Sequence, residues 1–310
     1  MRILLTGSNG QLGSEFRSLD GSTAEVISTG SHELDLTDEQ ETRRFVRDAK
    51  PSVIINTAAF SDMDAAERNW DACFALNAIA PVVLAEEAHR FDALLIHYST
   101  DQVFDGSKTE PYLETDPTSP LNVYGASKLA GEQGIASSFA RALILRLSWI
   151  YSARGENFLR SILRLAKYSN ELQVANDQIG APTSAGSVAR ATERLVRMYA
   201  SAKKTQFPTG IYHLTAGEST SWHGFASAIL SIAPGGKKPV VTPTVTTEHS
   251  SFAKRPRNSV LSCQKFLTTF GFELAPWPQQ LAEVMEEIQK QEASWDIQGS
   301  PNLIGFDEAV

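Results

Sequence analysis

Short apolar segments alternate with amphipathic segments along the first half of the chain. Apolar runs separated by stretches with helical spacing lie at residues 3–5, 25–27, 53–55, 93–96 and 143–145. This alternation is typical of βαβ units, in which right-handed crossover helices join parallel strands. The pattern therefore predicts an α/β protein built on a Rossmann-type, doubly wound parallel sheet.

The second half of the chain is less regular. After Trp149, short elements are interrupted by prolines at positions 182, 208, 234, 239 and 243, and helical patterns recur at residues 187–199, 222–232 and 278–289. We expect a first domain over residues 1–150 that binds NAD(P), and a smaller C-terminal substrate-binding lobe over residues 151–290. Segments of this lobe can interleave with the first domain. Residues 291–310 show no clear period and form a tail of unassigned role.

A glycine-rich turn follows the first apolar run. The sequence TGSNGQLG places glycines at positions 7, 10 and 13. In a dinucleotide-binding turn the first glycine permits a tight bend, the second lets the backbone approach a pyrophosphate, and the third lets the helix pack closely. The N-terminus of that helix offers N–H groups to the phosphates. A glycine triplet alone also fits an ordinary turn, but its position before a series of βαβ units favours cofactor binding by Gly7, Asn9, Gly10, Gln11, Leu12 and Gly13.

The ends of the next two strands bear on which cofactor binds. The segment 28–32 has no carboxylate to hold a ribose 2′-hydroxyl and no arginine to hold a 2′-phosphate. NADPH is therefore allowed and mildly favoured over NADH. Asp35 and Leu36 are expected beside the adenine, although Asp35 fits a capping or turn carboxylate equally well. Ala58 and Ala59 follow the third strand and are small enough for a dinucleotide to approach.

Tyr124 and Lys128 are four residues apart and therefore share one face of a helix. A nearby cation favours the ionised form of a phenol, whose ordinary pKa is about 10. Such a tyrosine would protonate a developing alkoxide as hydride arrives from a nicotinamide, and Tyr124 and Lys128 would also contact the cofactor. Thr100, directly after the fourth strand, is expected to polarise the carbonyl, with Ser99 as the neighbouring alternative. This spacing also occurs in surface pairs, but the glycine turn favours catalysis.

Composition excludes several classes of protein. The 310 residues are 42% hydrophobic and 21% charged, which is typical of a globular protein. A formal net charge of −8 opposes binding to nucleic acid. The distant Cys73 and Cys263 suggest neither a disulfide framework nor a zinc cluster. Because no apolar run approaches the ~18 residues of a membrane span and no signal peptide is evident, we expect a cytoplasmic protein without a membrane partner.

Several motifs carry a resemblance to known families. TGSNGQLG, NTAA, STD and YGASK resemble the extended short-chain dehydrogenase/reductase family. HYSTDQVFDG, PLNVYGASKLAGE, RLSWIY, GENF, DQIGAPTSA and RPRNSVL resemble, in matching order to about Ile288, the dTDP-4-dehydrorhamnose reductase family. The resemblance implies catalysis by Thr100, Tyr124 and Lys128. It also implies NAD(P)H-dependent reduction of the 4-keto group of a dTDP-6-deoxyhexose, which gives dTDP-L-rhamnose or a close relative.

The same resemblance implies residues for the nucleotide-sugar substrate. Trp149 would pack against the sugar, although an aromatic residue after a strand is as often core packing. Arg255 would bind the pyrophosphate, although it fits a surface arginine equally well. Gln102 replaces the tyrosine of the family pattern STDYVF, which leaves the particular sugar open.

The resemblance is compatible with a homodimer. Some family members bind magnesium between subunits through acidic residues, one of them at the position of Glu15. A lone glutamate near a helix start also fits a partner of the helix dipole, so we predict no metal site.

Two other functions use the same fold. One is a non-catalytic, cofactor-binding regulatory subunit of the methionine adenosyltransferase-beta type. The other is a nucleotide-sugar epimerase, which would recycle the hydride internally. A dehydratase would need an acidic pair beside Thr100, but Asp101 is followed by Gln102. The presence of Thr100, Tyr124 and Lys128 favours a reductase.

Overall fold

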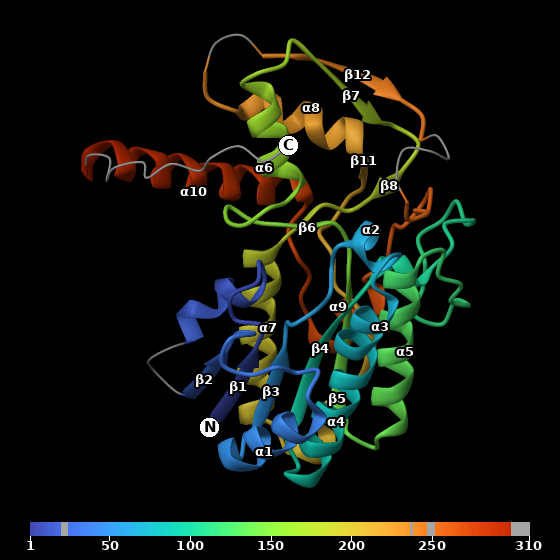
Figure 1. Cartoon of the computed structure of the whole chain (residues 1–310), viewed down its shortest axis with the longest axis vertical. Helices are drawn as coiled ribbons and strands as arrows, with labels where there is room; N and C mark the ends of the chain where they lie inside the picture. The colour runs from blue at the N-terminus through green and yellow to red at the C-terminus, as the bar shows by residue number, and fades with distance from the viewer. Residues whose placement is uncertain (20–23, 236–237, 247–251, 299–310) are drawn as a thin grey trace.

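A parallel six-stranded sheet forms the core of one half of the molecule (Figure 1). The computed structural model describes residues 1–19, 24–235, 238–246 and 252–298. The strand order is β10-β5-β4-β3-β1-β2, and every neighbouring pair is parallel. The strands are β1 (Arg2–Thr6), β2 (Glu25–Thr29), β3 (Val53–Asn56), β4 (Leu94–Thr100), β5 (Arg141–Leu147) and β10 (Gly210–His213). The apolar runs correctly predicted the first five; β10 comes from the second half of the chain.

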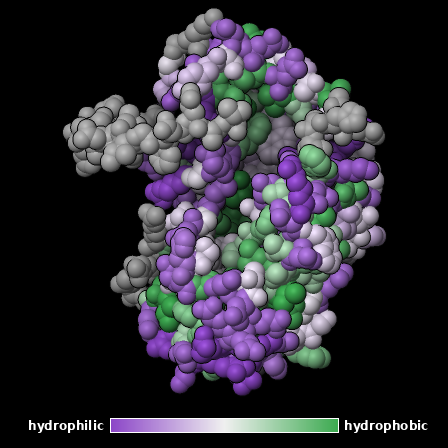
Figure 2. Space-filling model, in the orientation of Figure 1, coloured by the Kyte–Doolittle hydropathy of each residue, from purple (hydrophilic) through white to green (hydrophobic). Residues whose placement is uncertain are grey.

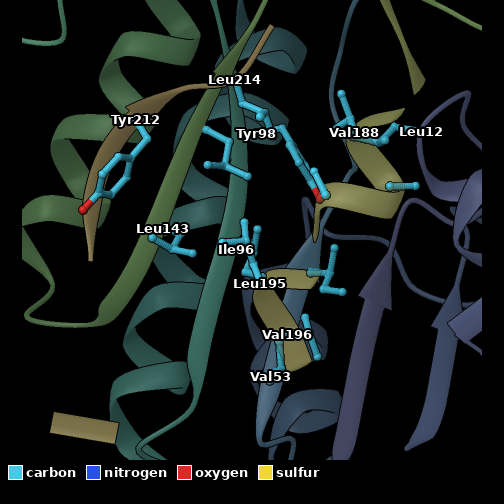
Figure 3. Packing of buried hydrophobic residues seen from close by; sticks show 14 of the residues in the cluster. Leu12, Val53, Ile96, Tyr98, Leu143, Val188, Leu195, Val196, Tyr212 and Leu214 are labelled. Carbon is cyan, nitrogen blue, oxygen red and sulfur yellow. The ribbon is translucent and has the colours of Figure 1, made fainter. Parts of the chain in front are cut away.

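Helices cover both faces of this sheet. One face packs against α1 (Glu39–Ala49), α4 (Ala80–Arg90) and α5 (Val123–Ser137). The other packs against α7 (Ala185–Ser201) and α9 (Gln264–Phe270). In Figure 3, Val53 and Ile96 of the sheet face Val188 and Leu195 of α7. Burial on both faces explains why these strands are continuous apolar runs rather than alternating ones, and it confirms the doubly wound α/β fold.

Some helical segments differ from their predicted form. The helix expected after the glycine turn is the 3₁₀ helix η1 (Gly13–Leu19), and Glu15 donates its backbone N–H to the Leu12 carbonyl at 3.1 Å. The chain between β3 and β4 is divided among α2 (Met63–Ala66), α3 (Trp70–Phe74), the π-helix η2 (Ala75–Ile79) and α4. A short 3₁₀ turn, η3 (Asp101–Val103), follows β4 directly.

A second, smaller core lies above the sheet in Figure 1. It is built from the parallel pair β7 (Glu171–Ala175) and β12 (Val240–Thr244), with α6 (Phe158–Ala166), α8 (Trp222–Ile232) and the first turns of α10 (Trp277–Gln298). Two short strand pairs complete this half: β6 (Ile150–Tyr151) with β9 (Thr183–Ser184), and β8 (Ile179–Gly180) with β11 (Thr220–Ser221). The 3₁₀ turn η4 (Lys204–Gln206) instead lies beside the start of β5, where the Lys204 carbonyl accepts from Arg141 Nη1 at 3.0 Å.

The chain passes between the two cores more than once. After β5 it enters the second core, returns to the sheet through α7 and β10, and returns again through α9. The division at residue 150 stays a prediction, and these three elements are the segments that interleave.

Helix α10 continues to Gln298, so the first part of the expected tail is helical, whereas residues 299–310 lie outside the described residues. None of the described helices is both long and apolar enough to span a membrane.

Candidate active site

A cavity of about 1320 Å³ lies at the carboxyl edge of the sheet, between the two cores. Figure 2 shows the hollow at this level of the molecule, with hydrophobic residues in its depth. Parallel sheets bind ligands at this edge because the loops after the strands converge there. The predicted site residues that line the cavity are Gly7, Asn9, Gly10, Gln11, Leu12, Asp35, Leu36, Ala58, Ala59, Thr100, Gln102, Tyr124, Lys128, Trp149 and Arg255.

The glycine turn packs too tightly for side chains at two of its positions. Gly7 has φ +75°, and a Cβ atom there would lie 2.5 Å from the backbone nitrogen of Ala58. Gly13 is the one predicted cofactor residue not lining the cavity; a Cβ atom on it would lie 2.1 Å from the Gly7 carbonyl oxygen. Gly10 donates its N–H to that same oxygen at 3.0 Å. The turn therefore folds back on itself, and Gly7 and residues 9–12 border the cavity while Gly13 packs on the inside.

We expect Gly13→Ala to weaken NADPH binding by roughly 10-fold or more, since a tenfold loss needs only about 1.4 kcal/mol. The added methyl group would overlap the Gly7 carbonyl and displace the turn. Titration calorimetry with NADPH measures the change. Gly186→Ala is a matched control, because its Cβ would make only ordinary contacts of 3.4 Å and longer. A folded Gly13→Ala variant with normal affinity would contradict this account of the turn.

The loop after β2 contains a carboxylate, Glu33, that the sequence did not single out. Glu33 folds back so that its Oε2 accepts the N–H of Gly30 at 2.8 Å, at the end of β2. A carboxylate therefore does stand at this strand end, contrary to the expectation from the segment 28–32. Asp35 accepts the N–H and the hydroxyl of Thr37, and these bonds lower its pKa. Leu36 is buried in the core between the sheet and the helices α1 and α4, and it also forms part of the cavity wall.

Helix α5 holds Tyr124 and Lys128 against the end of β4. Its N-cap is Asn122, whose Oδ1 accepts the N–H of Gly125 at 2.7 Å. A Cβ atom at Gly125 would lie 2.2 Å from the carbonyl oxygen of Gln102. Glycine at this position therefore allows the first turn of α5 to pack directly on η3.

The Tyr124 and Thr100 side chains both line the cavity, and Thr100 is close enough to act on the pKa of the Tyr124 hydroxyl. Burial raises the pKa of Tyr124 to about 12, the negative charge of Asp101 adds to this, and the bond to Thr100 opposes it. The expectation that Lys128 lowers the pKa of Tyr124 is therefore not met here, because burial dominates. At neutral pH Tyr124 keeps its proton and is able to donate it.

Asp101 is a buried carboxyl group that sequence reasoning did not include in the site. It accepts hydrogen bonds from Thr100 Oγ1 at 3.0 Å and from Ser148 Oγ at 2.8 Å, and burial raises its pKa. Gln102 donates weakly to it at 3.4 Å and accepts from Asn122 Nδ2 at 3.2 Å. The amide of Gln102 is thus held by protein groups at the cavity wall.

Lys128 is 2% exposed and extends from α5 beneath the cavity toward β4. Its Nζ lies 3.4 Å from Nε2 of His97, a fully buried residue of β4. Burial lowers the pKa of Lys128 to about 8, and the charge of Glu132 opposes this shift. Residue patterns alone did not single out His97, because a lone histidine in an apolar strand is more often a satisfied core residue.

Two tryptophan side chains, Trp149 and Trp222, also form part of the cavity wall. Trp149 lies between β5 and β6 with φ +47°, and its ring stacks on that of Trp222 with centroids 3.5 Å apart and planes within 3°. A Cβ atom at Gly180 would lie 2.4 Å from Trp149 Cε2, so the ring has protein on that side. Trp149 therefore combines core packing with a place in the cavity wall.

Arg255 also lines the cavity. Its Nη2 lies 3.6 Å from an oxygen of Asp64, and its buried Nε has no hydrogen-bond partner among the described residues.

Glu15 lies apart from this site, in a small cavity with Arg190, Glu283 and Glu287. No cluster of three acidic, histidine or cysteine ligands suited to a metal occurs in the described chain.

Comparisons with known proteins agree over most of the chain. Residues 1–290 match the family described as RmlD substrate binding domain. A dTDP-4-dehydrorhamnose reductase of Burkholderia thailandensis is 43% identical over 284 residues, which cover 89% of this chain and 95% of that protein.

Two solved structures are similar in fold as well as in sequence. A dTDP-4-dehydrorhamnose reductase of Clostridium acetobutylicum has a TM-score of 0.87 and 36% identity, covering 93% of this chain and 100% of the other. The Bacillus anthracis dTDP-4-dehydrorhamnose reductase in complex with NADP has a TM-score of 0.83 and 32% identity, with coverage of 92% and 99%.

Proposed function

This chain belongs to the RmlD substrate binding domain family, and on that premise we propose that it reduces dTDP-4-dehydrorhamnose to dTDP-L-rhamnose. It is an NAD(P)-dependent oxidoreductase of nucleotide-sugar biosynthesis. The observation that carries the proposal is that Tyr124, Lys128 and Thr100 line the same cavity as the glycine turn.

The residues around the cavity fit a dinucleotide. The Gly7 turn would hold the pyrophosphate, Ala58 and Ala59 leave space beside it, and Asp35 with Leu36 would border the adenine. Tyr124 and Lys128 would contact the nicotinamide end. When bound, NADPH or NADH supplies the hydride that reduces the ketone.

Tyr124 supplies the proton in this proposal. Its raised pKa keeps the hydroxyl protonated at neutral pH, so it is ready to donate to the oxygen that becomes the new alcohol. Thr100 lines the same cavity, and both hydroxyl groups would help polarise the ketone. Because the site is largely buried, a hydrogen bond to the oxygen on which negative charge develops is stronger there than it would be in water.

Three further residues would hold the nucleotide sugar. We assign sugar packing to Trp149, whose ring is fixed by Trp222, and pyrophosphate binding to Arg255, whose Nε is available in the cavity wall. Gln102 would contact the sugar where related sequences have tyrosine. A cytoplasmic location and a homodimer stay predictions from the sequence.

The decisive assay follows the absorbance of reduced nicotinamide in the presence of dTDP-4-dehydrorhamnose and either NADPH or NADH. A reductase oxidises one cofactor for each sugar reduced. An isomerised sugar without net oxidation would instead identify an epimerase. Tight cofactor binding with no reaction on several keto sugars would support the regulatory-subunit alternative and contradict the proposal.

A further inference from the structure

A row of buried polar side chains crosses the sheet and ends at Lys128. Thr6, Asn56 and His97 are register neighbours on β1, β3 and β4. Thr6 Oγ1 lies 2.8 Å from Asn56 Oδ1, Asn56 Nδ2 lies 3.1 Å from His97 Nδ1, and His97 Nε2 lies 3.4 Å from Lys128 Nζ. None of the four side chains is more than 2% exposed. Because Thr6, Asn56 and His97 are sealed from water and only Lys128 borders the cavity, the hydrogens of these three side chains must be assigned within the row.

A backbone amide fixes the orientation of Asn56. The N–H of Ala58 points at Oδ1 of Asn56 with a distance of 3.2 Å. A backbone N–H only donates, so the atom that faces it must be the amide oxygen and not the amide nitrogen. The Thr6 hydroxyl donates to the same oxygen. The amide nitrogen of Asn56 therefore points at His97 and donates to it.

The orientation of Asn56 fixes the tautomer of His97 in turn. Because Nδ1 accepts a hydrogen bond from Asn56, it carries no proton. Burial lowers the pKa of His97 well below its ordinary value, so the ring is neutral. A neutral ring with a bare Nδ1 must carry its single proton on Nε2. That N–H group is the one directed at Lys128.

An Nε2–H group discriminates between the two protonation states of a lysine. An ammonium group has three donors and no acceptor, so it gains no hydrogen bond from a second donor, whereas a neutral amine accepts one. We propose that the row Thr6, Asn56 and His97 holds a hydrogen-bond donor against Lys128 and thereby weakens the hold of this lysine on its proton. His97 is accordingly a positioning residue that acts through Lys128.

The other charged and titratable groups around Lys128 do not cancel this effect. Glu132, on its own helix, favours the ammonium form but is engaged by Arg146 of β5 at 2.6 Å. Cys73, on α3, acts in the same direction as Glu132, yet burial outweighs both and the pKa of Lys128 falls to about 8. Tyr124 shares its helical face, and Asp101 lies beyond Tyr124 on η3.

The catalytic consequence rests on the proposed function. After Tyr124 has given its proton to the ketone oxygen, a phenolate remains on α5. The Lys128 ammonium passes one proton to that phenolate, which leaves neutral Tyr124 and a neutral amine. The amine then accepts the Nε2–H of His97 until it regains a proton from water. The Nε2–H donor of His97 therefore makes it easier for Lys128 to give up a proton to Tyr124 in each turnover.

The tautomer itself is measurable without substrate or cofactor. Nitrogen-15 spectra of the full-length protein, with labelled histidine and with His97→Gln to assign the signal, distinguish a protonated ring nitrogen from a bare one. We expect a proton on Nε2 and none on Nδ1. A proton on Nδ1, whether as the other tautomer or as imidazolium, would overturn the inference. This result is independent of whether the protein reduces a nucleotide sugar.

Asn56→Asp tests the link to Lys128 with an isosteric change. Its second carboxylate oxygen would accept from Nδ1, so the proton should move to Nδ1 and Nε2 should become an acceptor for the ammonium group. We expect the titration midpoint of Lys128 to rise by about one unit or more, as judged by its carbon-13 Cε signal. The Lys128-dependent step in the pH profile of kcat should move in the same direction.

Two comparisons keep this test decisive. Asn176→Asp, in the second core, preserves the bond that Asn176 accepts from Ser221 and should leave the Lys128 midpoint in place. The negative charge introduced by Asn56→Asp would by itself raise the midpoint without changing the tautomer, so the histidine spectrum of the same variant must show the switch. An unchanged tautomer or midpoint in folded Asn56→Asp would refute the link. If this variant does not fold, the wild-type spectrum still decides.

Discussion

Replacing Tyr124 with phenylalanine is expected to lower kcat by roughly 10²- to 10⁴-fold, the usual contribution of a positioned proton donor. The substitution removes the phenolic hydroxyl from the cavity and leaves the ring, and hence the packing of α5, in place. NADPH affinity should change little, because most of the expected cofactor contacts come from the glycine turn and the ends of β2 and β3. Steady-state kinetics together with calorimetric binding of NADPH separate the two quantities.

Tyr168→Phe is the matched control for that experiment, since Tyr168 is 85% exposed and does not line the cavity. It should retain full activity. Normal turnover by Tyr124→Phe would remove Tyr124 from the chemistry. A large loss of NADPH affinity in the same variant would instead show that the ring has a structural role in the cofactor site.

Glu132→Ala is expected to lower the free energy of unfolding by about 3–5 kcal/mol, the range for removing one partner of a buried ion pair. Glu132 and Arg146 are each 2% exposed and are joined by two hydrogen bonds, of 2.9 and 2.6 Å. Without the carboxylate, the Arg146 guanidinium is left in the core beside Phe104 and His213 with an uncompensated charge. Urea unfolding followed by circular dichroism measures the loss.

Two further variants test whether the loss of stability in Glu132→Ala comes from the uncompensated buried charge of Arg146. Glu286→Ala breaks the exposed pair with Lys290 and should cost only about 0.3–0.5 kcal/mol. The double variant Glu132→Leu with Arg146→Met removes both charges and should recover much of the stability lost by Glu132→Ala. A loss for Glu132→Ala as small as that for Glu286→Ala would show that water reaches Arg146.

Local pattern was sufficient to predict the sheet strands and the catalytic helix. Apolar runs marked β1 to β5 because these strands are buried on both faces, and the spacing of Tyr124 and Lys128 placed both on one face of α5. Fourteen of the proposed cofactor and substrate residues, together with Thr100, line one cavity, although their roles stay predictions. Gly13 acts at a distance from the cavity, by letting the turn close on the Gly7 carbonyl.

Local sequence patterns could not predict contacts between segments that are far apart in the chain. Asn56 is 50 residues from Thr6 and 41 from His97, so only the register of three strands brings their polar groups together. The stack of Trp149 on Trp222 likewise depends on how two separate segments fold back. Glu33 was missed for a local reason: its carboxylate returns to Gly30 through a turn that residue spacing alone did not reveal.

The late arrival of β10 and α7 in the sheet has a consequence for how the protein is made. When β5 leaves the ribosome, one apolar face of the nascent sheet still lacks the helix that covers it, and the outer edge of β5 still lacks β10. At roughly 5–20 residues per second, about 3–13 s of translation separate β5 from β10. During that interval the growing chain presents unpaired backbone and exposed leucines, and is therefore a natural client for a chaperone that binds such surfaces.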